Sequence, residues 1–197
     1  MIVRRSTHTE YRMFGLGKGK TRLNSAAKIF CIGLSGTGTR SLHRAMRLLG
    51  LSSCHYPQSL DDFARHQVLL DIPVACRYRE LDIMFPGSRF ILTTRELESW
   101  LDNRSRKPPD RTPPSLWVQE NRLRTYGVPA FDRELYRVRH KEYHDGVHEY
   151  FKDRPGDLMV MSVVEGDGWD KLCPFLGVPV PMGQPFPTVR NAHSPVR

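Results

Sequence analysis

The sequence lacks the features that mark a secreted or membrane-spanning protein. Its four cysteines form no C-x-x-C pair, so a disulfide framework is not expected; they are Cys31, Cys54, Cys76 and Cys173. No apolar run approaches the roughly 20 residues that cross a bilayer. The N-terminus also lacks the apolar core of a secretory signal. We therefore expect a reduced, cytoplasmic chain that makes no membrane contact.

Acidic residues are scarce, because 21 Asp and Glu face 30 Lys and Arg, which gives a formal net charge of +9. Such a charge suits a polyanionic ligand. Nucleic acid would suit it too, but the basic residues are spread along the chain and no nucleic-acid-binding module is recognisable. We therefore expect no nucleic-acid partner, and a solvated basic surface remains the alternative explanation.

The length of 197 residues fits one domain with a substantial core and short tails. Residues 1–27 hold six Lys or Arg and one acid, Glu10, which predicts a flexible basic tail, with a targeting leader as the alternative. The domain is expected over residues 28–191. A second tail is expected at 192–197.

Residues 28–50 form the pattern around which the chain is organised. The apolar run 28–32 has the length of a buried strand, segment 33–41 is rich in glycine and hydroxyl residues, and 42–49 has helical spacing before Gly50. In such a strand–turn–helix, backbone N–H groups and the helix N-terminus converge on one point and favour an anion there. The predicted ligand-binding residues are Ser35, Gly36, Thr37, Gly38, Thr39, Arg40 and Ser41.

This loop differs from that of an ATPase or kinase. The pattern G-x-x-x-x-G-K-[ST] fits at Gly33 and Gly38, but Thr39 replaces the lysine and Arg40 replaces the magnesium-binding hydroxyl residue. Without those two side chains a kinase would lack its charge clamp and its metal site. We therefore expect an anion held without a metal, and a turn that binds nothing is the alternative.

The rest of the chain alternates between short apolar runs and helical patterns. Strands are predicted at 51–55, 89–94 and 158–164, and helices at 60–68, 73–84, from 96 onward, at 131–151 and after 168. Segment 104–115, rich in Arg, Lys, Pro and Ser, is expected to be a mobile loop. This order predicts a three-layer α/β fold with a mainly parallel sheet.

Three histidines recur at every fourth residue, at His140, His144 and His148. They would lie along one helix face, as metal ligands can. Neither interval reads H-E-x-x-H, and no cysteine cluster accompanies them. A polar or partly buried helix face is therefore the preferred explanation.

The loop segment Leu34-Ser35-Gly36-Thr37-Gly38-Thr39-Arg40 resembles the 5′-phosphosulfate loop of sulfotransferases that use PAPS (3′-phosphoadenosine-5′-phosphosulfate). The segments 70–75, 85–93, 168–177 and 185–187 resemble one compact subgroup of that family, which has a P-loop NTPase-like fold. The resemblance covers about residues 28–191 apart from 104–130. That family has Lys or Arg where Gly36 stands, and Arg40 is the candidate replacement.

The resemblance implies further site residues. In the family a strand-end Arg and a Ser eight residues later hold the 3′-phosphate. Here Arg95 matches, the eighth residue is Asn103, and Ser99 is the alternative. Trp169 and Lys171 are candidates for the same end of the nucleotide.

Sulfuryl transfer also needs a base that takes the acceptor's proton. His55, after the predicted second strand, and Asp71, before a predicted helix, are the two candidates. Their structural alternatives are a turn histidine and a helix N-cap.

The expected function is in-line transfer of a sulfuryl group from PAPS to a hydroxyl or amine of a small molecule, with PAP as product and no metal. One alternative is a nucleotide-dependent phosphotransferase. Another is a PAP-binding protein without catalysis, because Gly36 replaces the usual basic residue. The sequence predicts neither the acceptor's identity nor the oligomeric state.

Overall fold

The computed structural model describes residues 27–106 and 114–189. The predicted tails, 1–27 and 192–197, lie outside these residues except for residue 27. Most of the predicted loop 104–115 also lies outside them. Within it, Arg104 and Ser105 belong to a helix, so the loop prediction is wrong for these two residues.

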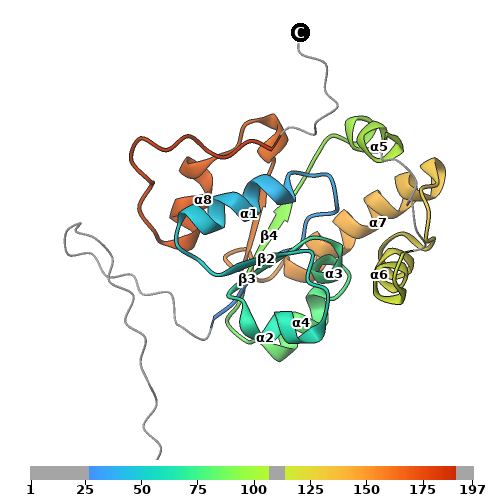
Figure 1. Cartoon of the computed structure of the whole chain (residues 1–197), viewed down its shortest axis with the longest axis horizontal. Coiled ribbons are helices and arrows are strands. Elements are labelled where there is room, and N and C mark those ends of the chain that lie inside the picture. The colour runs from blue at the N-terminus through green and yellow to red at the C-terminus, as the bar shows by residue number, and fades with distance from the viewer. Residues whose placement is uncertain (1–26, 107–113, 190–197) are drawn as a thin grey trace, which may run out of the picture.

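A five-stranded, all-parallel sheet forms the centre of the molecule (Figure 1). The spatial order is β2-β3-β1-β4-β5, with β1 Ile29–Cys31, β2 Ser53–His55, β3 Val68–Leu70, β4 Arg89–Thr93 and β5 Leu158–Met161. This confirms the predicted α/β class. Since the chain leaves β1 toward one edge and β4 toward the other, the topological switch point lies between these two strands.

Eight α-helices and one 3-10 turn connect the strands in the described ranges. The helices are α1 Thr39–Leu48, α2 Leu60–Arg65, α3 Ile72–Ala75, α4 Tyr78–Met84, α5 Leu97–Ser105, α6 Leu116–Tyr126, α7 Arg133–Phe151 and α8 Trp169–Leu176, and η1 is Val163–Glu165. Gly50 follows α1 in the left-handed conformation, as predicted. None of the helices in the described ranges is long and apolar enough to cross a membrane.

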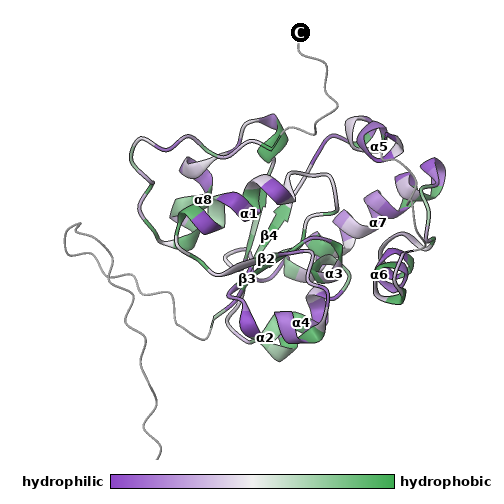
Figure 2. Ribbon diagram, viewed as in Figure 1, coloured by the Kyte–Doolittle hydropathy of each residue, from purple (hydrophilic) through white to green (hydrophobic). Residues whose placement is uncertain are grey.

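Alternating side chains of the strands build a core on each face of the sheet. Ile29 and Cys31 of β1 pack with α1 and α8, whereas Phe30 packs with α2, α3, α4 and α7. Strands β1, β3 and β5 are apolar along their whole length, and β4 is apolar between its end residues, because both faces of the sheet are covered (Figure 2). The edge strand β2 is more polar and only partly buried. The chain is therefore layered as helices, sheet and helices.

A third apolar cluster joins α5, α6 and α7 beside the carboxyl ends of the strands (Figure 1). Trp100 of α5 is fully buried, and its ring stacks on Tyr136 of α7 with centroids 5.6 Å apart. Its indole N–H donates to the carbonyl of Ser35 at 3.0 Å. The cluster thereby fixes α5 against the loop that follows β1.

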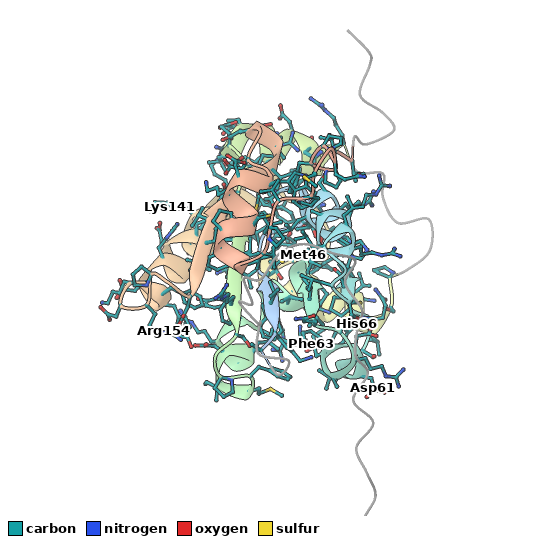
Figure 3. The ribbon with its side chains drawn as sticks, turned by 90° about the vertical axis from the view of Figure 1, so that its left-hand side faces the viewer. Met46, Asp61, Phe63, His66, Lys141 and Arg154 are labelled. Carbon is teal, nitrogen blue, oxygen red and sulfur yellow. The ribbon has the colours of Figure 1, made fainter. Side chains whose placement is uncertain are left out.

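The burial of individual side chains agrees with this layered arrangement. Met46 of α1 is buried in the interior, whereas Lys141 of α7 and Arg154 after it lie at the outer edge of the molecule (Figure 3). On α2, Phe63 is buried and Asp61 is exposed in an ion pair with Arg65. Short amphipathic helices thus suffice to cover a small sheet.

The structure corrects four further sequence predictions. The strand predicted at 158–164 ends at Met161, and Val163–Glu165 form the 3-10 turn η1. Residues 68–70 form strand β3, which lies between β2 and the central strand β1, and not the end of a helix from 60, because a three-residue apolar run fits either element. The predicted helix 73–84 is divided into α3 and α4. Helix α6 lies within residues 104–130, for which the sequence analysis predicted no helix; its surface has little apolar periodicity to reveal it.

His140 is a partly buried titratable residue of α7, and its burial makes the free energy of unfolding depend on pH. Its ring packs between Trp100 and His144, at centroid distances of 4.9 and 4.1 Å, and its Nε2 is buried with no hydrogen-bond partner among the described residues. Burial and the neighbouring His144 lower the pKa of His140 to about 4. The folded state therefore resists a proton that the unfolded state accepts near pH 6.5.

We predict that His140 makes the protein less stable as the pH falls from about 6.5 to about 4, with no further contribution below that range. Replacing it with a non-titrating apolar residue, His140→Leu, should flatten the fall in urea midpoint over this range. The exposed His148 provides the control, and His148→Leu should leave the fall unchanged. Equal pH profiles for His140→Leu and the wild type would contradict the prediction.

Candidate active site

A cavity of about 500 Å³ opens at the carboxyl ends of the strands. This size lies within the range of about 300–1,000 Å³ of small-molecule sites. Segments from both sides of the switch point line it: Ser35, Gly36, Gly38, Thr39, Arg40, Ser41, His55, Tyr56, Asp71, Arg95, Asn103, Arg104, Val163, Val164, Thr188 and Val189. The sequence predicted ten of these residues for a single site, and the structure brings those ten together.

The loop 33–38 needs glycine for two different reasons. At Gly33, a Cβ atom would lie 1.7 Å from the Thr93 hydroxyl of β4, so only glycine lets the two strand ends approach. Gly36 has φ +95°, and its Cβ would lie 2.7 Å from Asn103 Oδ1. Gly38, also left-handed, precedes α1. The loop therefore turns with its backbone exposed to the cavity.

The Asp71 carboxylate is the centre of a buried hydrogen-bond cluster. Ser35 Oγ donates to Oδ1, Thr39 Oγ1 donates to Oδ2 at 2.8 Å, and the backbone N–H of Ile72 donates to Oδ1 at 2.7 Å. His55 Nε2 lies 3.1 Å from Oδ2. Asp71 thus caps α3, as the sequence alternative predicted, and also ties the loop to the end of β2.

The charge state of this cluster follows from its partners. Burial opposes the ionisation of Asp71, but hydrogen bonds from His55, Ser35 and Ile72, with the charge of His55, lower its pKa to about 2. An ionised carboxylate only accepts hydrogen bonds, so His55 Nε2 carries a proton. Asp71 thereby orients the His55 ring and leaves Nδ1 as the ring nitrogen that is not directed at the carboxylate.

Arg95, directly after β4, lies against the loop. Its Nη1 donates to the carbonyl of Gly36 at 3.3 Å, and its Nε donates to Ser99 Oγ at 3.0 Å. Ser99 does not line the cavity but positions the guanidinium of Arg95. Burial and the charge of Arg106 lower the pKa of Arg95, which leaves its positive charge in need of an anion.

Two neighbours at the end of α5 have polar atoms without partners. Asn103 Oδ1 and Arg104 Nε are both buried, and neither has a hydrogen-bond partner in the described part of the chain. Asn103 was predicted from its spacing after Arg95. The sequence analysis missed Arg104, because 104–115 has the composition of a loop and no pattern separates this arginine from its neighbours.

Other predicted residues have structural partners. Thr37 is fully buried: its hydroxyl donates to the carbonyl of Leu34 at 2.7 Å and lies 2.7 Å from that of Thr93. Ser41 Oγ accepts from the backbone N–H of Val189 at 2.9 Å, which fixes the segment after α8 over the start of α1 (Figure 1). Arg40 lines the cavity and is exposed.

Trp169 and Lys171 do not line the cavity. The Trp169 indole packs on Phe186 and donates to the carbonyl of Gln184 at 2.8 Å. Lys171 forms an ion pair with Asp167 at 2.8 Å. Trp169 thus fixes the segment after α8, and Lys171 fixes the segment before it.

Among the described residues, the ring nitrogens of the histidine series do not gather into a group of three. The rings of His140 and His144 are in contact and tilted against each other, and His148 is exposed. Within the described ranges, the only three potential ligand atoms within 4.8 Å of one another come from Cys54, Asp62 and His66. Asp62 there belongs to the capping box of α2.

The fold and the cavity define an α/β protein with a glycine-rich loop and a basic site at the switch point of a parallel sheet. Residues 57–194 match the family model described as a sulfotransferase domain. Because this match covers most of the chain, the chain belongs to that sulfotransferase family, as the sequence resemblance indicated. Comparison with curated proteins gave no match. Asp71, Arg95 and Asn103 lie within the matched segment, and the loop precedes it.

The backbone conformation of Asp71 should reverse the usual order of stability, in which an alanine variant is more stable than a glycine variant. Asp71 has φ 83° and ψ −176°, a region that is nearly exclusive to glycine and costs other residues about 1–3 kcal/mol. Asp71→Gly and Asp71→Ala both remove the carboxylate, but only glycine relieves this strain. We predict that Asp71→Gly is the more stable of the two by about 1–3 kcal/mol in urea unfolding.

The matched control is the exposed Asp61 in helix α2. There the order should be the usual one, with Asp61→Ala more stable than Asp61→Gly by about 0.5–1 kcal/mol. Finding Asp71→Ala to be more stable than Asp71→Gly would show that the surroundings of Asp71 do not impose this backbone conformation.

Proposed function

We propose that this sulfotransferase transfers a sulfuryl group from PAPS to a hydroxyl or amine group of a small molecule. The family supports sulfuryl transfer in general, and the cavity supports this particular donor. The observation that carries the proposal is the contact of Arg95 with Gly36, because it places a cation and the N-terminus of α1 around one cavity. Both favour a bound anion.

The donor has two anionic ends, and the cavity has two sets of donors. The backbone of 35–41 would hold the 5′-phosphosulfate at the start of α1. Arg95, positioned by Ser99, and the amide of Asn103 would hold the 3′-phosphate. The buried Arg104 Nε–H, which has no partner among the described residues, is a donor that an anionic ligand would complete.

The acceptor would react at the end of the cavity that contains His55. In the proposed step a new S–O or S–N bond forms to the acceptor, and the bond from sulfur to the bridging phosphate oxygen breaks. That oxygen keeps the electron pair and leaves as part of PAP. His55 Nδ1 takes the acceptor's proton, and Asp71 stabilises the imidazolium that results.

The step assigns no role to a metal. The Thr39 hydroxyl donates to Asp71, and Arg40 stands where a phosphotransferase has its magnesium-binding hydroxyl. Fixed cations and backbone N–H groups would neutralise charge instead. The free thiols of Cys31, Cys54, Cys76 and Cys173 support a reducing, cytoplasmic compartment.

Ligand-induced stabilisation tests the donor assignment. PAP and PAPS should raise the melting temperature, since a ligand at about 100 times its Kd stabilises by about 2.7 kcal/mol. Arg95→Met should weaken PAP binding about 10- to 100-fold, because it removes a charged hydrogen-bond donor. The exposed Arg65, paired with Asp61, supplies the control variant Arg65→Met, which should bind PAP like the wild type.

Two outcomes would replace this proposal. Stabilisation by ATP–Mg or GTP–Mg but not by PAP would identify a nucleotide phosphotransferase. PAP binding without transfer of radiolabelled sulfate to any of a panel of phenols, alcohols and amines would identify a PAP-binding protein without catalysis.

The base assignment makes a separate prediction. His55→Gln should lower kcat by about 100-fold or more, because it removes general-base catalysis, and should change PAP affinity less than tenfold. His66 bonds Ser52 and does not line the cavity, so His66→Gln is the control and should retain the wild-type rate. A His55→Gln variant with the wild-type kcat would refute the role of His55.

A further inference from the structure

The geometry of the loop disfavours a cationic side chain at residue 36. A side chain there would have to adopt φ +95° and place its Cβ 2.7 Å from Asn103 Oδ1. Any lysine or arginine at this position would therefore strain the backbone and displace Asn103. A positive charge at this part of the cavity has to come from another element.

Arg104 lies at that place. Its Cδ is 3.5 Å from the position that a Gly36 Cβ would occupy, so its alkyl chain passes directly over the glycine. Arg104 lines the cavity, and none of the ion pairs among the described residues involves it. Its Nε is buried without a partner in those residues. A half-buried cation without a carboxylate is costly unless an anion joins it.

The surroundings of Arg104 show which end of the cavity it serves. Burial raises the pKa of Tyr56 to about 12 and that of Tyr126 still further. On both hydroxyls the charge of Asp71 adds to this rise, and the charge of Arg104 opposes it. The charge of Arg104 and a hydrogen bond from it also oppose the rise that burial causes in the pKa of Tyr136. Arg104 therefore lies among three tyrosine hydroxyls, and it shares the cavity wall with Tyr56 and Asp71. Arg95, in contrast, pairs with Ser99.

We propose that Arg104 is a catalytic residue that supplies the cation missing from the loop at Gly36 and contacts the sulfuryl end of the donor. This inference rests on the proposed function. As the acceptor attacks sulfur and loses its proton to His55, negative charge grows on the bridging oxygen that leaves with PAP. The guanidinium of Arg104 stabilises that charge and is unchanged by the step.

Arg40 is the competing source of this charge. It lines the cavity but is exposed on α1, where water screens its charge. Arg104 is partly buried and passes over Gly36 itself, so its charge acts at shorter range and with less screening. The structure therefore favours Arg104 over the replacement that the sequence suggested.

The experiment compares Arg104→Met, Arg104→Lys and Arg106→Met. Arg106 is exposed two residues further on, does not line the cavity, and controls for the loss of one positive charge. Turnover of radiolabelled PAPS is measured with the best acceptor of the panel, or with water if none reacts. PAP affinity is measured by calorimetry, and melting temperatures confirm that each variant is folded.

We expect Arg104→Met to lower kcat about 100-fold and to change PAP affinity less than tenfold. Arg104→Lys should recover about tenfold of the lost rate, since it restores the charge without the planar fork. Arg106→Met should behave as the wild type. If Arg104→Met does not fold, Arg104→Lys decides: a wild-type kcat with weakened PAP binding would overturn the proposal.

Failure of this inference is distinguishable from failure of the proposed function. A wild-type protein that binds no PAP or turns over no PAPS refutes both. If the wild type is active and Arg104→Met is as active as Arg106→Met, only the role of Arg104 is refuted. The same holds if Arg104→Met loses PAP affinity in proportion to kcat, because Arg104 would then be a nucleotide-binding residue.

Discussion

The site depends on one buried carboxylate. Asp71 accepts hydrogen bonds from the loop after β1, from the first turn of α1 and from the backbone at α3, and it contacts His55 at the end of β2. Three parallel strand ends are thereby held at fixed separations by a group that is 3% exposed. Its strained backbone persists because these partners over-determine it, as is common at functional sites.

The second constraint is steric and concerns the side chain that Gly36 lacks. Its positive φ and the adjacent Asn103 make any larger residue strained, so in the proposed site the loop geometry and the loop charge are supplied by different elements. In the proposed site the loop contributes backbone N–H groups, Arg95 contributes one cation and Arg104 contributes another. Helix α5 can carry this task because Trp100 fixes it to the carbonyl of Ser35. Packing in the third apolar cluster is therefore coupled to the electrostatics of the cavity.

Sequence patterns predicted the elements whose periodicity is unambiguous. The long helix α7, the strand β4 and the loop before α1 were predicted because length, apolar runs and glycine spacing agree there. Strand β3 was missed because Val68–Leu70 is too short for its period to be read. Arg104 was missed for another reason: its role depends on crossing Gly36 in space, and sequence spacing does not encode that contact. Trp169 and Lys171 lie elsewhere because packing and an ion pair hold them.

The hydroxyl of Thr39 shows why a P-loop-like backbone need not imply phosphotransferase chemistry. Where an ATPase has a lysine directed at the phosphates, this chain has a buried threonine whose hydroxyl donates to Asp71 and lies 3.1 Å from His55. The side chain at this position therefore contacts Asp71 and His55, the pair that would activate the acceptor, and supplies no positive charge to the anionic end of the donor. A carboxylate satisfied by Ser35, Thr39 and a backbone N–H has little capacity left to hold a hydrated magnesium ion. In the proposed site the backbone N–H groups of this loop bind the anionic donor. The side chains of Ser35 and Thr39 hold Asp71, which orients His55 for removal of the acceptor's proton. Sulfuryl transfer requires both.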